Sequence, residues 1–149
     1  MTPSVRILLV DDFGPWRSFV ASLLQKNPEW QIVCEASDGL EGIQRADELQ
    51  PDLIVLDIGL PKLNGIEAAP SIRRIAPASK ILFSSENRSS EVAAAAVNAG
   101  GHGYVLKSDA ANELLVAVEA VLQGKRFVSS TFTGFDLTIP EGPSRDEFR

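Results

Sequence analysis

The sequence predicts an α/β fold: a doubly wound, five-stranded parallel sheet with helices on both faces. Along the 149 residues, five short aliphatic runs alternate with five segments whose apolar residues recur at helical spacing. The runs are four to six residues long and mostly lack polar alternation, which is typical of strands covered on both faces. Because crossovers between parallel strands are right-handed, strict alternation of strands and helices favours a sheet with helices on both sides.

The expected strands share an abrupt polar end, except one that carries polar residues throughout and therefore suits the edge of the sheet. That strand is 31–36. The full set is 5–10, 31–36, 53–56, 80–83 and 103–106.

The expected helices are 15–26, 40–49, 64–76, 89–99 and 109–123. Asp38 is a candidate N-cap, with Glu41 three positions on. Serine or aspartate also precedes two later helices, so either Ser89 or Ser90, and either Ser108 or Asp109, is expected to cap. Pro70 lies inside the third helix, where its missing N–H and its ring predict a kink or a late start.

Composition narrows the class of protein. Lys and Arg total 14 against 20 Asp and Glu, a net charge of −6, which lacks the basic footprint of nucleic-acid binders. No apolar run approaches the ~18 residues of a membrane span, and the N-terminus lacks the layout of a signal peptide. The single cysteine, Cys34, lies in an apolar run and is expected to be a buried thiol in a reducing compartment. We therefore expect a cytoplasmic protein that contacts neither membrane nor nucleic acid.

Polar residues follow four of the expected strands at the point where each strand ends. They are Asp11, Asp12, Asp57, Ser85 and Lys107. The carboxyl ends of parallel strands share one edge of a sheet, where ligands bind. Three carboxylates gathered there repel one another unless a cation or a proton compensates, and Mg²⁺ suits partly hydrated oxygen ligands. A lysine and a hydroxyl beside them supply the charge and hydrogen bond that a phosphoryl group needs.

Five motifs occur in order at the strand–helix junctions. They are Val10-Asp11-Asp12, Leu56-Asp57, the loop 60–65 (LPKLNG), Ala99-Gly100 and the stretch 103–108 (GYVLKS). With these motifs, residues 6–127 resemble the receiver domains of two-component response regulators. The last stretch resembles the NarL/FixJ-like subgroup, whose members usually carry a LuxR-type helix-turn-helix that this chain lacks. The resemblance implies a flavodoxin-like receiver fold with strand order 2-1-3-4-5, with a receiver domain over 1–127 and a tail or linker stub over 128–149.

The resemblance also implies roles in phosphoryl transfer. Asp57 would accept a phosphoryl group from a phosphohistidine on a sensor histidine kinase. Asp12 and Asp57, with the backbone carbonyl of Gly59, would bind Mg²⁺ directly, and Asp11 would hold a metal-bound water. Lys107 would contact the phosphoryl oxygens.

Further roles concern the response to phosphorylation. Ser85 and Tyr104 would form the switch, while Gly59 and Asn87 occupy positions that affect the lifetime of the phosphoryl group. Helix four, strand five and helix five would form the output surface, and Val116 and Ala120 on the last helix suggest a homodimer there. Two positions depart from the usual pattern: Phe13, where the subgroup often has His, and Glu86, where a small or apolar residue is usual.

Plainer interpretations stay open. Asp12 alone would suit a helix N-cap, Ser84 rather than Ser85 would fill the switch position if the alignment slipped by one, and Tyr104 would be an ordinary core aromatic. His102 lacks a partner at ligand spacing and is expected to be a surface-loop histidine.

Two other functions remain. The first is the receiver part of a longer LuxR-type DNA-binding transcription regulator. It would need a longer reading frame, because the 22 residues of 128–149 are fewer than the ~40 that fold alone and leave no room for a DNA-binding domain. The second is a metal-dependent phosphatase, a class that generally places another Asp two residues after the nucleophile, where this chain has Gly59.

Overall fold

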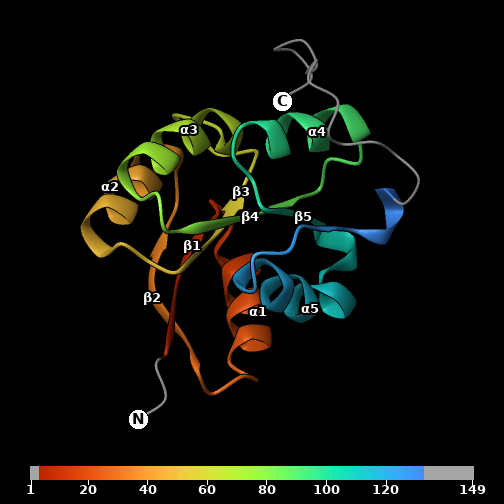
Figure 1. The fold of residues 1–149 in the computed structure, drawn as a ribbon, viewed down its shortest axis with the longest axis horizontal. Helices are drawn as coiled ribbons and strands as arrows, with labels where there is room; N and C mark the ends of the chain where they lie inside the picture. The colour runs from red at the N-terminus through yellow and green to blue at the C-terminus, as the bar shows by residue number, and fades with distance from the viewer. Residues whose placement is uncertain (1–3, 133–149) are drawn as a thin grey trace.

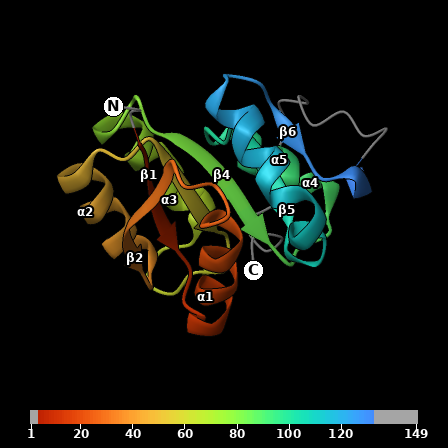
Figure 2. The same cartoon turned by 90° about the horizontal axis from the view of Figure 1, so that it is seen from below.

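The computed structural model describes residues 4–132. In that part of the chain a parallel sheet lies between two helices on one face and three on the other (Figures 1 and 2). The strands are β1 (Val5–Val10), β2 (Trp30–Ala36), β3 (Leu53–Asp57), β4 (Lys80–Ser85), β5 (Gly103–Leu106) and β6 (Phe127–Val128). The α-helices are α1 (Gly14–Leu24), α2 (Gly39–Leu49), α3 (Gly65–Ile75), α4 (Ser90–Asn98) and α5 (Ala110–Leu122).

The strand order is β2-β1-β3-β4-β5-β6, so the expected order of the first five is confirmed and the expected count of five is wrong. The additional strand, β6, pairs in parallel with β5 through Gly103–Phe127 and Tyr104–Val128. A two-residue strand is too short to show a periodic pattern in the sequence. Residues beyond the expected receiver boundary at 127 therefore join the sheet, while 133–149, the rest of the expected tail, lie outside the described residues.

Buried side chains form one cluster on each face of the sheet. One joins β-strand residues such as Leu56 and Phe83 to α2, α3 and α4, and the other joins residues such as Leu9 and Val105 to α1 and α5. In the views of Figures 1 and 2, α1 and α5 lie together on one side and α2, α3 and α4 on the other. The central strands are buried on both faces, as their unbroken aliphatic runs predict.

Helix starts follow local capping chemistry. Asp38 accepts a hydrogen bond from the Glu41 N–H at 2.8 Å, which confirms the expected cap. Ser89, not Ser90, caps α4. Before α5 neither expected side chain caps: a short 3₁₀ turn, Lys107–Asp109, leads into the helix, and Asp109 instead accepts from the Thr131 hydroxyl at 3.1 Å.

Pro70 lies within α3, which runs from Gly65 without a late start. The start is set upstream of the proline by a capping box, in which Asn64 accepts from the Glu67 N–H and the Glu67 side chain accepts from the Asn64 N–H. Pro70 itself is exposed, so its ring points away from the sheet.

Two expectations about single residues are wrong. Cys34 is only half-buried, because β2 is the edge strand of the sheet. His102 lies in the loop before β5, as expected, but is half-buried instead of on the surface: its Nδ1 accepts the Ile81 N–H at 3.0 Å, and its Nε2 lies 3.3 Å from Arg73 Nη1. Burial, followed by the charge of Arg73, lowers the pKa of His102 to about 4. Within residues 4–132, none of the helices has the length and apolar character that crossing a membrane requires.

Candidate functional site

A cleft opens at the carboxyl edge of the sheet, where β1, β3, β4 and β5 end side by side. In-register pairing aligns these ends: Val10 lies opposite Leu56, Asp57 opposite Ser84, and Ser85 opposite Leu106. The residue types that the sequence placed at strand ends are therefore brought together. The cleft is lined by Asp12, Phe13, Asp57, Ile58, Gly59, Ser85, Glu86, Asn87 and Lys107.

Three carboxylates meet at this edge of the sheet, and two of them, Asp12 and Asp57, line the cleft. Asp11, Asp12 and Asp57 each offer an oxygen, and these oxygens lie within 4.8 Å of one another. Asp11 and Asp57 are buried, at 4% and 7% exposure, whereas Asp12 faces solvent. Burial and the nearby charge of Asp11 raise the pKa of Asp57 to about 6. A cation bound among the three would relieve this repulsion.

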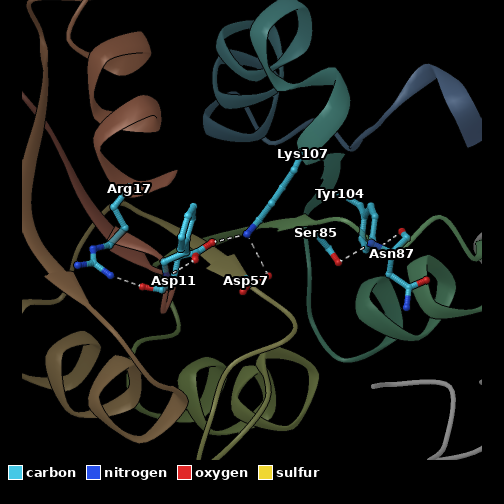
Figure 3. Close-up of polar contacts among 8 residues, drawn as sticks. Asp11, Arg17, Asp57, Ser85, Asn87, Tyr104 and Lys107 are labelled. Atoms are coloured by element: carbon cyan, nitrogen blue, oxygen red, sulfur yellow. Dashed lines mark hydrogen bonds and ion pairs between the residues drawn. The ribbon is translucent and has the colours of Figure 1, made fainter. Parts of the chain in front are cut away.

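Lys107 partly supplies that positive charge. Its Nζ donates to Asp11 Oδ2 at 2.7 Å and lies 3.7 Å from Asp57 Oδ1, reaching across from the end of β5 (Figure 3). Its charge works against the rise in the pKa of Asp57. Lys107 is thus the cation placed to meet a charged group on Asp57.

Two residues of α1 that the sequence analysis did not assign to the site support this arrangement. Arg17 donates to the backbone carbonyl of Asp11 and also to Glu35 on β2. The ring of Trp16 lies under Lys107, with Nζ 5.2 Å from its centroid. Both lie in the first turn of α1, four and five residues after Asp12, and a position this close to the strand end is the signal that would have found them.

Asp12 does not cap α1, so the N-cap interpretation of this residue is wrong. The N-cap position is Phe13, which makes no side-chain cap, and the Phe13 N–H donates to Asp11 Oδ1 at 2.9 Å. The Asp12 carboxylate is left free to face the cleft.

Ser85, Tyr104 and Asn87 form a small network at the other side of the cleft (Figure 3). Ser85 Oγ accepts the Asn87 N–H at 3.0 Å, and the Tyr104 hydroxyl donates to the Asn87 carbonyl at 2.8 Å. Tyr104 is fully buried, and burial raises its pKa to about 12. Ser85 lines the cleft, whereas Ser84 lines a separate small cavity beside Leu9 and Trp16.

The loop after β3 approaches Asp57 through its backbone. The Gly59 backbone near the Asp57 carboxylate works to lower the pKa of Asp57, which favours the ionised form. Gly59 is exposed, and a side chain there would meet nothing within 4 Å. Phe13, 60% exposed, and Glu86, also exposed, stand at the mouth of the cleft.

Comparison with curated proteins finds relatives that are response regulators. The nitrate/nitrite response regulator protein NarL of Escherichia coli (strain K12) is 35% identical over 127 residues, which cover 85% of this chain and 59% of NarL. The transcriptional regulatory protein LiaR of Bacillus subtilis (strain 168) is 33% identical over 130 residues, covering 87% of this chain and 62% of LiaR. The chain thus spans little more than half the length of these relatives.

Solved structures agree in fold. A two-component response regulator of the LuxR family from Aurantimonas sp. superposes with a TM-score of 0.82 at 38% identity, covering 85% of this chain and 91% of that one. The response regulator domain of Thermotoga maritima CheB gives a TM-score of 0.75 at 29% identity, covering 80% and 97%. The family model for the response regulator receiver domain matches residues 7–119. The chain belongs to the response regulator receiver family.

Proposed function

We propose that this chain is a phosphoacceptor of two-component signalling, with Asp57 as the residue that carries the phosphoryl group. The observation that supports this most is the pairing of a buried carboxylate with a lysine ammonium in an open cleft. Asp57 is 7% exposed, Lys107 Nζ is 3.7 Å from it, and both line the same cavity. In this view the protein signals through partners and catalyses at most its own phosphorylation and dephosphorylation.

In the proposed reaction, a carboxylate oxygen of Asp57 attacks the phosphorus of a phosphohistidine on a sensor histidine kinase. The P–N bond breaks, the imidazole nitrogen keeps the electron pair, and an acyl phosphate forms on Asp57. Such transfers depend on positioning and charge neutralisation more than on acid–base chemistry. Lys107 supplies positive charge beside the transferred group and donates hydrogen bonds to its oxygens.

The carboxylate cluster fits Mg²⁺, because three oxygen ligands converge and one of the three residues faces solvent. Asp12 and Asp57 would hold the ion with the Gly59 carbonyl, and Asp11 would hold one of its waters. When bound, the ion would neutralise charge on the phosphoryl group and offset the mutual repulsion of the carboxylates.

Ser85 and Tyr104 are the proposed switch. The Ser85 hydroxyl lines the cleft next to Asp57 and engages the Asn87 backbone, to which Tyr104 is also bonded. A phosphoryl group on Asp57 brings new acceptor oxygens, to which the Ser85 O–H would donate. Tyr104 would change rotamer with it, while Gly59 and Asn87, at the rim, would set how long the group survives.

A small acyl phosphate, such as acetyl phosphate, tests the proposal. Incubation with Mg²⁺ should add one phosphoryl group by intact mass, and the Asp57→Asn variant should gain none. Asp47→Asn, an exposed carboxylate on α2, is the matched control and should be phosphorylated like the unaltered protein. Phosphorylation that persists in Asp57→Asn would contradict the assignment.

A second candidate concerns the whole protein. Relatives such as LiaR are named transcriptional regulatory proteins, and this chain spans 62% of LiaR. We infer that the receiver serves a longer DNA-binding regulator, in which the helix-turn-helix would follow residue 149. Reading the gene beyond that residue tests this directly. The phosphatase alternative is tested by hydrolysis of a generic phosphomonoester, which we expect to be absent.

The proposed output surface is α4, β5 and α5, through which two copies would pair. Val116 on α5 is 57% exposed, whereas the alanine-rich stretch Val92–Val97 of α4 is buried. Pairing would therefore rest on α5. Size-exclusion chromatography with and without beryllofluoride tests it, and a monomer under both conditions would contradict it.

A further inference from the structure

The chain that follows α5 returns to the sheet and binds the strand that carries Lys107. We call residues 127–132 the C-terminal strap. It comprises β6, Ser129 and a 3₁₀ turn, Ser130–Phe132, and its strand β6 (labelled in Figure 2) pairs with the outer edge of β5. No expected site residue lies in the strap, and the expected receiver boundary at 127 left all but its first residue outside the domain.

Ser129 binds β5 through both its backbone and its side chain. Its side chain and backbone are buried, at 1% exposure. The Ser129 N–H donates to the Tyr104 carbonyl at 2.9 Å, and Ser129 Oγ accepts the Leu106 N–H at 2.8 Å. One residue thus holds β5 on both sides of Val105.

The Ser129 hydroxyl takes the place of a backbone acceptor at this position. Sheet pairing between β5 and β6 ends at Tyr104 and Val128. The Ser129 carbonyl accepts the Phe132 N–H at 2.9 Å and so closes the 3₁₀ turn. The Ser129 side chain therefore satisfies the buried Leu106 N–H, and an alanine there would leave that donor without its acceptor.

The other residues of the strap contact β5, the 3₁₀ turn after it and α5. Phe132 is 3% exposed and meets Tyr104 edge to face, with centroids 5.5 Å apart. The Ser130 N–H donates to Glu113 at 3.2 Å, and Thr131 donates to Asp109. The strap is tied both to the proposed switch tyrosine and to the turn that contains Lys107.

We propose that Ser129 is a positioning residue for Lys107. Leu106, whose N–H it binds, directly precedes Lys107, and the bond fixes the end of β5 from which the ammonium reaches Asp11 and Asp57. The inference rests on the proposed function, since it assigns Ser129 an effect on phosphoryl transfer to Asp57. It also makes Ser129 a neighbour of the site, because a single hydrogen bond joins it to Leu106, the residue before Lys107.

The test compares two buried serines. Ser129→Ala removes the acceptor of the Leu106 N–H, next to Lys107. Ser79→Ala removes an equally buried hydroxyl at the opposite end of the strands, where Ser79 precedes β4 and donates to the Pro51 carbonyl. Both variants lose one buried hydrogen bond, so both should unfold more easily. With acetyl phosphate and Mg²⁺, Ser129→Ala should be phosphorylated about tenfold more slowly, because a displaced charge costs much of the rate. Ser79→Ala should match the unaltered rate, and Ser129→Thr, which keeps the hydroxyl, should recover most of it.

A second readout needs no phosphorylation. The position of Lys107 affects the fluorescence of Trp16, over whose ring its Nζ lies. Measured in a Trp30→Phe background, this emission should change in Ser129→Ala and not in Ser79→Ala.

The outcomes separate the two proposals. If the unaltered protein is phosphorylated and Ser129→Ala behaves like Ser79→Ala in rate and emission, the positioning role is overturned and the proposed function stands. If the unaltered protein takes up no phosphoryl group but the emission changes only in Ser129→Ala, the proposed function fails and the placement of Lys107 by Ser129 is supported.

Discussion

Asp57 holds its proton more tightly in the folded chain than in the unfolded one, because burial and Asp11 raise its pKa from 3.8 to about 6. At a pH between these two pKa values, unfolding releases the Asp57 proton. The free energy of unfolding therefore falls as the pH rises through this window. The full difference corresponds to ~3 kcal/mol as an upper bound. With a chelator present to remove metal ions, we expect the stability that protonated Asp57 contributes at pH 4 to be lost by pH 7. Added Mg²⁺ should then restore stability at pH 7. Urea titrations of the unaltered protein and Asp57→Asn measure it, and a variant with the same pH slope would contradict it.

His102 contributes with the opposite sign. Its pKa falls from 6.5 to about 4, so the unfolded chain binds the proton first as the pH drops. The stability that neutral His102 contributes above pH 6.5 is lost as the pH falls toward 4. We expect His102→Asn, which offers an amide oxygen to the Ile81 N–H, to lose less stability on acidification than the unaltered protein. Urea titrations at pH 7 and pH 4.5 check this, and equal losses would count against it.

Individual residues differ in how far their roles could be predicted from the sequence. Asp11, Asp57, Ser85 and Lys107 could be placed together because each ends a strand, and the ends of parallel strands converge. Ser129 and His102 could not be recognised in this way. Their importance comes from backbone N–H groups, those of Leu106 and Ile81, that become partners only when distant segments pack.

At the scale of elements, the start of α3 lies against Asp57, the proposed phosphorylation site. A side chain at Gly65 would collide with the carbonyl oxygen of Asp57, whereas at Gly14, also the first residue of a helix, the nearest atom is the end of Arg17 at 3.6 Å. We expect Gly65→Ala to lose ~2 kcal/mol or more and to be phosphorylated more slowly, because the Asp57 backbone must shift. Gly14→Ala should change stability by at most ~1 kcal/mol, in the stabilising direction. Equal effects in urea denaturation would refute this contrast.

Pro70 offers a complementary test on α3. It is exposed and removes one hydrogen bond from the interior of the helix, the one to the Ile66 carbonyl. Pro70→Ala should raise the free energy of unfolding by about 1–2 kcal/mol, the helix gain being offset in part by a more flexible unfolded chain. Pro77→Ala, just beyond the helix, is the control and should bring no gain. A lower denaturation midpoint for Pro70→Ala would show that the ring packs favourably.

Helices and strands could be predicted where their hydrophobic pattern extends over several residues. Helix starts with a side-chain cap, such as Asp38, followed from local chemistry, and the order of the first five strands followed from the family resemblance. The start of α5 did not, because Lys107–Asp109 forms a 3₁₀ turn and Asp109 binds Thr131 from the strap. Partners more than twenty residues away override a local capping signal of this kind.

At the scale of the whole molecule, the strap adds to the core. Phe132 belongs to the cluster on the face of α2, α3 and α4. A chain ended after Gly124 would lose this side chain, worth about 1.5–3 kcal/mol by burial alone, together with the hydrogen bonds of Ser129. We expect its denaturation midpoint to lie well below that of the full chain. A midpoint unchanged within error would mean that the strap contributes nothing to folding.

Strap and sheet together have a consequence for association between copies. With β6 in place, the Tyr104 carbonyl and the Leu106 N–H on the outer side of β5 are hydrogen-bonded, and β5 is an interior strand. Without the strap these groups would form an open edge four residues long on a strand that is buried throughout. Open apolar edges recruit further strands. The strap therefore also guards against edge-to-edge aggregation, and a shortened chain should scatter light on concentration where the full chain stays clear.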